Sequence, residues 1–260
     1  MKFLKLVFRN FIFALEGDLL FKANFFIKIL SAVVGDIIAP LVALLIYTNT
    51  PGIPGWTLYE FFLLQGTLIL TLGIVNVFVI GLPGRIMDLI EDGDFDNYLI
   101  KPYNTLMYSI SRSFDLDAIP EILVGLTIII YSLSNLDLNL GINLMIYLLF
   151  ILSAIIVQAS GLIIIAALSF FFVKSSALME LYHRLLTFAR YPTSIYSFPI
   201  RFFISFIFPV ALASFYPAKA LISGLEPNIT VIMLFSVMVL FLVSLMLWEF
   251  GMRKYRSAGG

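Results

Sequence analysis

Long apolar segments constrain this chain more than any other feature of its sequence. A helix needs about 20 consecutive apolar residues to cross the hydrocarbon core of a bilayer. The segments that meet this length lie near residues 25–47, 58–80, 118–134, 142–172 and 229–250, and a sixth falls within 176–222. Only 12% of the residues are charged, about half the share found in soluble domains. The sequence therefore predicts an all-α integral membrane protein with six transmembrane helices in a lipid bilayer.

The composition also excludes several kinds of function. Lys and Arg number 16, as do Asp and Glu, so no excess of positive charge favours a nucleic acid as partner. There is no cysteine, and His183 is the only histidine, which excludes thiolate and multi-histidine metal sites within one chain. The sequence has no phosphate-binding Gly-x-x-x-x-Gly-Lys-Ser/Thr loop, no Gly-x-Ser-x-Gly and no His-Glu-x-x-His. We therefore expect no catalytic residue, cofactor or metal in this chain, and any ATP and Mg to be bound by another polypeptide.

Lys and Arg residues gather in three stretches, which sets the predicted orientation. They lie in the first 23 residues, in residues 83–117 and in the tail at 251–260, whereas the turns at 48–57, 135–141 and 223–228 contain none. Positive residues are retained on the cytoplasmic side of a membrane. The chain is thus predicted to be a multi-pass protein of the cytoplasmic (inner) membrane with both termini in the cytoplasm.

The first 23 residues predict an amphipathic helix at the membrane interface. On a helix, Lys2, Lys5, Arg9 and Glu16 fall on one side, away from most of the apolar residues. A cleavable signal peptide is disfavoured, because Arg9, Glu16 and Asp18 interrupt the apolar run. The segment is expected to lie on the bilayer surface.

Residues 173–222 leave two placements of the fifth span open. By charge alone, Lys174, His183, Arg184 and Arg190 make 174–201 cytoplasmic and leave 202–222 as the fifth span. In the alternative, 176–193 crosses the membrane and 199–222 forms a helical hairpin that dips in from outside and is broken at Pro209. Non-helical backbone at that depth is tolerated only where protein or a water-filled cavity covers it.

Residues 83–117 form the only long polar stretch between spans, and they carry a cluster of acids. Five of the 16 acidic residues fall within nine positions: Asp88, Glu91, Asp92, Asp94 and Asp96. The pattern predicts a short helix that begins after Pro83 and ends at Gly93 in a left-handed cap. A second helix, capped by Asp94 or Asp96, would stop before Pro102. Such a protrusion is either a solvated loop on the headgroups or a contact for a soluble partner.

Three stretches of the sequence resemble one known family. They are Gly93-Asp94-Phe95-Asp96 followed by Leu99-Ile100-Lys101-Pro102; Phe188-Ala189-Arg190-Tyr191-Pro192 with Ile195-Tyr196, Pro209 and Tyr216-Pro217-Ala218; and the ending Tyr255-Arg256-Ser257-Ala258-Gly259. Together with the order of spans, these stretches are similar to the type-2 (ABC-2) permease subunits of ATP-binding-cassette exporters, within a six-span bacterial group. The chain departs from the pattern at Asp94 and Phe95, where Glu and Leu are more usual, and at Lys101, often Arg.

The resemblance implies a function and a set of coupling residues. The chain would be the permease of an ATP-driven exporter of a lipophilic or amphipathic substrate. It would pair with a second permease chain, the same or homologous, and with two copies of an ATPase subunit. The residues implied in ATPase coupling are Asp88, Glu91, Asp94, Phe95, Asp96, Tyr98, Leu99 and Lys101. Phe95, Tyr98 and Leu99 would be the apolar anchors of that contact.

The resemblance also favours the outer re-entrant hairpin and gives the order of segments along one transmembrane permease domain, 1–260. An interfacial helix (1–23) precedes spans one and two (24–82), and the coupling region (83–117) precedes spans three and four (118–172). Span five and the hairpin (173–228) lead to span six (229–250) and the cytoplasmic tail (251–260).

Three residues within the apolar segments are candidates for a substrate path. Asp36 lies inside the first span, where a carboxylate costs about 2.5–3.5 kcal/mol on insertion scales. Asn76 and Pro209 are the other two. The alternative is that Asp36 and Asn76 only lock packing through hydrogen bonds between helices. Two other functions stay open: an ion-coupled secondary transporter, which requires several membrane-embedded acids, and a scaffold that transports nothing.

Overall fold

The computed structural model describes residues 2–20, 22–138, 141–172 and 176–256, which form helices and turns without a β-strand. The predicted all-α class is confirmed. Lys174 and the last four residues of the predicted tail lie outside the described residues.

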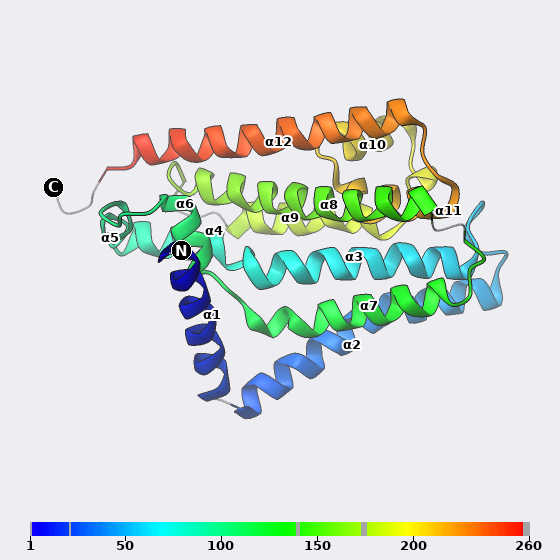
Figure 1. Cartoon of the computed structure of the whole chain (residues 1–260), viewed down its shortest axis with the longest axis horizontal. Helices are drawn as coiled ribbons and strands as arrows, with labels where there is room; N and C mark the ends of the chain where they lie inside the picture. The colour runs from blue at the N-terminus through cyan, green and yellow to red at the C-terminus, as the bar shows by residue number, and fades with distance from the viewer. Residues whose placement is uncertain (1, 21, 139–140, 173–175, 257–260) are drawn as a thin grey trace.

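Five helices are long and apolar enough to cross a bilayer, and they lie side by side (Figure 1). They are α2 (Lys22–Asn49), α3 (Leu58–Phe78), α7 (Ile119–Leu133), α8 (Gly141–Leu168) and α12 (Pro227–Lys254). Each corresponds to a predicted span. Helix α1 (Lys2–Leu20) runs across the bundle at the end where α12 also finishes (Figure 1). An interfacial helix is expected to lie at that angle to the spans.

Helix α3 occupies the centre of the bundle and begins with a capping box. The Thr57 hydroxyl accepts from the Glu60 amide at 3.3 Å, and the Glu60 carboxylate accepts from the Thr57 amide at 2.7 Å. Most of the helix is buried, chiefly against α7 and α8. Because two otherwise unpaired amides are satisfied at the start, the span begins at a defined residue.

Small residues bring α3 and α7 into close contact. A Cβ atom added at Gly125 of α7 would lie 2.5 Å from the Leu70 backbone nitrogen of α3. Gly66 and Gly73 of α3 face backbone atoms of α7 at similarly short range. Glycines allow this backbone approach, which is how membrane helices gain dispersion contacts without a hydrophobic driving force.

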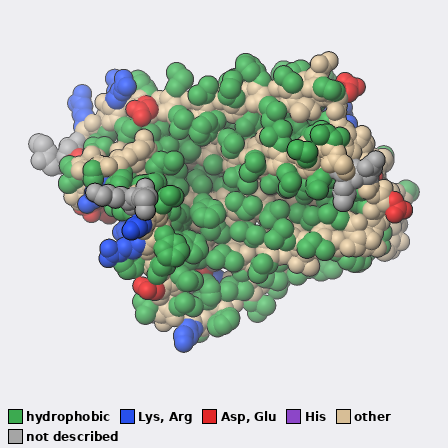
Figure 2. Space-filling model, in the orientation of Figure 1, with side chains coloured by type: hydrophobic (Ala, Val, Ile, Leu, Met, Phe, Trp, Pro, Cys, Tyr) green, Lys and Arg blue, Asp and Glu red, His purple; other side chains and the backbone are tan. Residues whose placement is uncertain are grey.

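The surface is apolar along the bundle and charged mainly at its ends (Figure 2). Helix α2 is exposed along nearly its whole length, and its neighbours are α3, α7 and α1. A wide apolar belt between charged ends matches a bilayer, in which exposed apolar side chains contact lipid.

The described part of residues 174–201 does not stay at the end of the bundle that holds α1. Helix α9 (Ser176–Thr187) and a 3-10 turn (Phe188–Arg190) run along α3, where the Gln65 amide donates to the Arg190 carbonyl at 2.7 Å. The chain then reaches Ser194, which lines a cavity with Pro54 and Gly55 of the first connection. That connection lies at the end opposite α1 (Figure 1). Residues 176–194 therefore run towards the far end of the bundle, as the alternative placement requires.

A broken helical hairpin follows. Helix α10 (Phe198–Phe202) continues into a π-helical turn (Phe203–Ile207) and ends at Phe208, whose ring lies near Gly161 of α8. After Pro209 and a 3-10 turn (Val210–Ala213), α11 (Phe215–Ser223) returns to the end it came from, where Lys219 lines the cavity that contains Ser194. The break falls at the predicted proline, and it is covered by protein, since Pro209 is buried.

Three short helices connect α3 to α7 at the end of the bundle that holds α1. Helix α4 (Gly81–Glu91) follows α3 with only Val79 and Ile80 between them, so it starts before Pro83 and not after it. Helix α5 (Asp96–Leu99) is a single turn, and α6 (Thr105–Ser111) is capped by Asn104. The predicted Asp caps are absent from the start of α5: the residue there is Phe95, and it has no side-chain hydrogen bond.

Candidate functional site

The turn between α4 and α5 positions the predicted coupling residues. Gly93 has φ +76°, the left-handed conformation predicted for it and one that a side chain disfavours. The turn is closed by a hydrogen bond from the Phe95 amide to the Leu89 carbonyl at 3.0 Å. This reversal directs Phe95 back towards the bundle.

Phe95 and Tyr98 face into this chain, which corrects their expected role as anchors in a partner's groove. Phe95 is 0% exposed, and its ring contacts Phe170 at 5.1 Å and Tyr255 at 5.0 Å. Tyr98 packs edge-on to Tyr108 of α6. We name the three contacting residues Phe95, Phe170 and Tyr255 the aromatic cluster. It joins the coupling segment to the ends of α8 and α12.

The exposed apolar residues of this segment are Leu99 and its neighbour Ile100, which is 76% exposed. Lys101 is exposed beside them. Sequence reasoning chose Leu99 and Lys101 but missed Ile100, although all three belong to the same motif. An apolar pair next to a cation, at the tip of a rigid turn, is suited to contact with a soluble protein.

The acidic residues of the predicted coupling segment lie in different environments. Asp88, Glu91 and Asp94 are all exposed, but only Asp88 lines a cavity with α1 and α6. Asp96 lies beside Tyr255: burial raises the pKa of the Tyr255 phenol, and the Asp96 carboxylate raises that pKa further. The eight predicted coupling residues therefore do not form one surface. Glu91, Asp94, Leu99 and Lys101 remain available to a partner.

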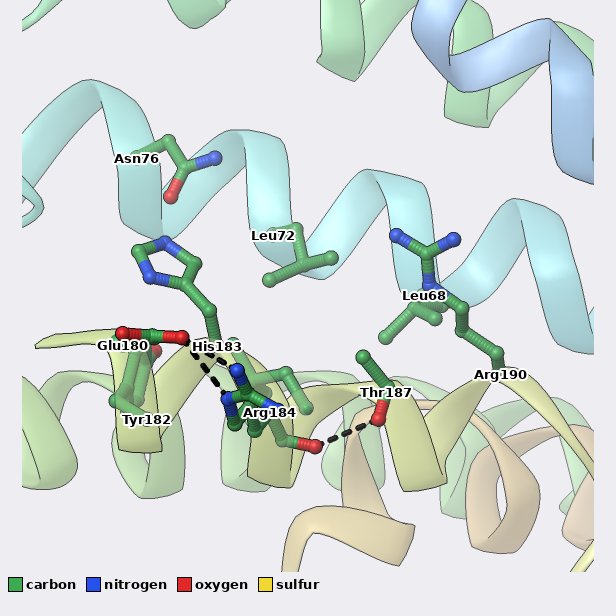
Figure 3. A pocket seen from close by; sticks show the side chains of 10 residues that line it. Leu68, Leu72, Asn76, Glu180, Tyr182, His183, Arg184, Thr187 and Arg190 are labelled. Atoms are coloured by element: carbon green, nitrogen blue, oxygen red, sulfur yellow. Dashed lines mark hydrogen bonds and ion pairs between the residues drawn. The ribbon is translucent and has the colours of Figure 1, made fainter.

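A second candidate site is a groove of about 370 Å³ between α3 and α9 (Figure 3). Its apolar wall contains Leu68 and Leu72 of α3, and its polar wall is formed by α9. There Arg184 is paired with Glu180 at 2.5 Å. The groove thus has one lipophilic side and one charged side at the depth of the spans.

Arg190 also lines this groove. Its guanidinium makes no hydrogen bond or ion pair with the residues that the structure describes. In Figure 3 its guanidinium lies on the side of α3, next to Leu68. An unpaired cation at this depth is costly and marks a candidate functional position. Sequence reasoning did not predict Arg190 as a site residue, because the neighbouring charged residues made the segment resemble a polar loop.

Asp36 and Asn76, two of the predicted path residues, belong to one polar strip beside this groove. The Asn76 amide donates to the Glu121 carboxylate at 2.8 Å, and Asn76 itself lines the groove. Asp36 acts electrostatically on Glu121 and is itself acted on by Arg190. The Asp36 Oδ2 atom is buried and accepts no hydrogen bond from the described part of the chain. The packing alternative therefore accounts for Asn76 but leaves Asp36 unexplained.

The prediction that Pro209 lines a substrate path is wrong. This proline is buried at the break of the hairpin and does not line the groove between α3 and α9 or the cavity at Pro54 and Gly55. A proline at a helix break supplies geometry rather than a contact surface. His183 lies exposed in the groove lining (Figure 3).

Comparison with known proteins decides the family. The family model described as "ABC-2 family transporter protein" matches residues 33–259, which is nearly the whole chain. The chain belongs to the ABC-2 transporter family. No curated protein and no solved structure matches it. The family resemblance predicted from the coupling and hairpin motifs is thus confirmed.

Membership of the ABC-2 family fixes the broad role of the chain. It is a membrane-embedded transport component of permease type, and the family implies association with an ABC ATPase. The five apolar helices give the membrane part of this description directly.

Proposed function

We propose that this ABC-2 permease exports a lipophilic or amphipathic substrate across the cytoplasmic membrane. A separate ATPase subunit would supply the energy. Two ATPase subunits and a second permease chain, the same or homologous, complete the transporter. Both termini and the α4–α5 turn lie in the cytoplasm, where the ATPase docks. ATP and Mg are bound by that subunit, and this chain contributes no catalytic residue.

The observation that carries this proposal is the aromatic cluster. Its members come from the coupling segment, from the turn after α8 and from the end of α12. Phe170 also contacts Trp248 inside α12 at 5.5 Å. Packed interiors transmit displacement because their side chains have no free volume. A force applied to the exposed tip at Leu99 to Lys101 therefore reaches two membrane-spanning helices.

The groove between α3 and α9 supports an amphipathic substrate. Leu68 and Leu72 suit an apolar body, while the guanidinium of Arg190, which makes no hydrogen bond or ion pair with the described residues, suits an acidic or strongly polar group. ATP binding would then shift the population between two arrangements of the bundle that differ in affinity for the substrate.

The direct test is co-purification from membranes of the native host, followed by ATP turnover. We expect the full chain to bring down an ABC ATPase subunit whose activity rises when the permease is present in lipid nanodiscs. If no ATPase is retained and no candidate ATPase is stimulated, the proposal fails.

Charge reversal at the tip tests the docking surface. Lys101→Glu is expected to lower ATPase retention about tenfold, the loss of one charge-assisted contact. The control is Lys254→Glu, the same change at an exposed lysine of α12 at the same end of the bundle. Equal retention by both variants would show that the ATPase docks elsewhere.

Ion-coupled secondary transport is the second candidate, because Asp36 and Glu121 place two acids in one membrane-embedded strip. Embedded acids of this kind are typical of proton and sodium relays. Reconstituted vesicles separate the two functions. Transport driven by a pH or sodium gradient without the ATPase would support this candidate and contradict the ATP-driven proposal.

A further inference from the structure

The cavity that Asp88 lines is larger than the groove between α3 and α9 and lies apart from it. It has a volume of about 820 Å³ and is bounded by α1, the start of α2, α4, α6 and the turn before α7. These elements meet at the end of the bundle where α1 crosses it (Figure 1). We name it the interfacial cavity. Its position is that of the headgroup layer, because α4 follows directly from the α3 span.

Two arginines that line the interfacial cavity have few partners. The Arg85 guanidinium donates only to the Tyr98 hydroxyl at 3.4 Å, and that of Arg112 only to the Asn10 amide oxygen at 3.5 Å. Both contacts are long and both acceptors are neutral, whereas a guanidinium has five donors suited to a phosphate or carboxylate. Neither arginine forms an ion pair with the described residues. Two guanidiniums are therefore free to bind an anionic group.

Three carboxylates of the same cavity have oxygens without a partner in the described part of the chain. Asp88 and Asp92 make no side-chain hydrogen bond or ion pair with the part of the chain that the structure describes. Asp117 pairs with Lys28 through one oxygen, and its other oxygen, Oδ1, is buried without a hydrogen-bond partner. A buried carboxylate oxygen without a donor is costly, so this group calls for a donor from outside the chain.

Apolar side chains surround the charged residues of the cavity, as a lipid ligand requires. Phe13, Phe114 and Leu89 line it next to the charges. Helix α1 exposes Leu4 and Phe8 as well as Phe13, so apolar side chains follow the helix that forms one wall. A ligand with a charged head in the cavity can thus place apolar chains along α1, in the plane where acyl chains begin.

We propose that the interfacial cavity binds the headgroup of an aminophospholipid such as phosphatidylethanolamine. Its phosphate is bound by Arg85 and Arg112, and its ammonium by Asp88, Asp92 and the free oxygen of Asp117. This headgroup carries an anionic and a hydrogen-bonding cationic group together. A choline headgroup lacks N–H donors, and a glycerol headgroup lacks the cation. The bound lipid would hold α1 against α4, and this site is independent of the proposed transport activity.

Lipid selectivity of the full-length protein tests the proposal without any variant. The purified chain is incubated with phosphatidylethanolamine, phosphatidylcholine and phosphatidylglycerol of identical acyl chains, and bound lipid is counted by native mass spectrometry. We expect phosphatidylethanolamine to be retained about tenfold better than the other two, the effect of one charge-assisted hydrogen bond. Equal retention of all three, or a preference for phosphatidylglycerol, would overturn the proposal. The proposal would also be overturned if soluble glycerophosphoethanolamine, at the same concentration as the lipid, displaced the bound lipid, because the site would then not require a lipid.

Charge variants separate the two halves of the site. Arg112→Gln is expected to weaken phosphatidylethanolamine and phosphatidylglycerol alike, because both have the phosphate. Asp92→Asn is expected to weaken only phosphatidylethanolamine. The matched controls are Arg253→Gln and Glu249→Gln, exposed residues near the end of α12 that do not line the cavity. Loss of retention equal to that of the controls would refute the assigned roles.

Filling the cavity gives a test without a change of charge. Gly84 lines the cavity, and a Cβ atom added there would meet nothing within 4 Å. Gly84→Leu is therefore expected to keep the fold, which size-exclusion chromatography checks, while it reduces phosphatidylethanolamine retention about tenfold. A Gly84→Leu variant that elutes normally and retains the lipid as well as the wild type would place the lipid elsewhere.

Discussion

Removal of the Phe95 ring is expected to loosen the end of the bundle that holds α4 and α5. Phe95 is fully buried and contacts two aromatic rings edge-on at 5.1 and 5.0 Å. Phe→Ala changes in cores cost about 3–5 kcal/mol, of which the two ring pairs contribute about 0.5–1.5 kcal/mol each. Phe95→Ala should therefore destabilise the protein by about 3–5 kcal/mol. The control is Phe198→Ala, because Phe198 is 77% exposed and its loss should cost within about 0.5 kcal/mol.

The chain contains its own reporters for this measurement. It has two tryptophans: Trp248 lies 5.5 Å from Phe170, and Trp56 lies at the other end of the bundle, 5.8 Å from Phe215. Thermal unfolding in detergent is followed by fluorescence of variants in which one tryptophan is replaced by Phe. We expect Phe95→Ala to lower the midpoint reported by Trp248 more than that reported by Trp56. Equal shifts at the two ends, or a shift no larger than that of Phe198→Ala, would refute the local role of Phe95.

Three further changes test other parts of the fold. Gly125→Leu should force α3 and α7 apart and lower the free energy of unfolding by about 1–3 kcal/mol, measured by thermal unfolding. The control is Gly35→Leu, because an added Cβ atom at Gly35 meets nothing within 4 Å. An equal loss of stability in both variants would contradict the close packing of α3 and α7. Gln158→Met should stabilise the protein by about 1–2 kcal/mol, because both polar atoms of the Gln158 side-chain amide are buried without a partner among the described residues. A loss of stability in this variant would show that the amide is paired. Asp36→Asn should leave membrane insertion unchanged and lower transport in vesicles, so transport at the wild-type rate would remove Asp36 from the path.

Length and hydropathy were sufficient to predict the five long helices, because the bilayer imposes a minimum on each apolar segment. The course of residues 176–194 along the bundle could not be found in this way. Helix α9 carries Glu180, His183 and Arg184 on the face that lines the groove, and those charges lower its hydropathy. The resemblance to a family favoured this course, and whether α9 is a fifth span stays a prediction.

The inward orientation of Phe95 could not be predicted from local sequence. Helix α5 is a single turn, too short for periodicity to define a buried face. The partners of Phe95 are Phe170 and Tyr255, which follow far later in the chain. Gly93 was predictable, because a left-handed residue between two short helices has a strong local signature.

The near continuity of α3 and α4 has a geometric consequence. Residues Leu58–Glu91 form 34 helical positions interrupted only around Val79 and Ile80. At 1.5 Å per residue this lever is at most about 51 Å long. If the end at Leu58 is the pivot, a tilt of about 5° displaces the end at Glu91 by about 4 Å, most of the rise of one helical turn. A small tilt of α3 can therefore produce a stroke on the scale of a side chain at the end of α4, and the glycine contacts require α7 to move with α3.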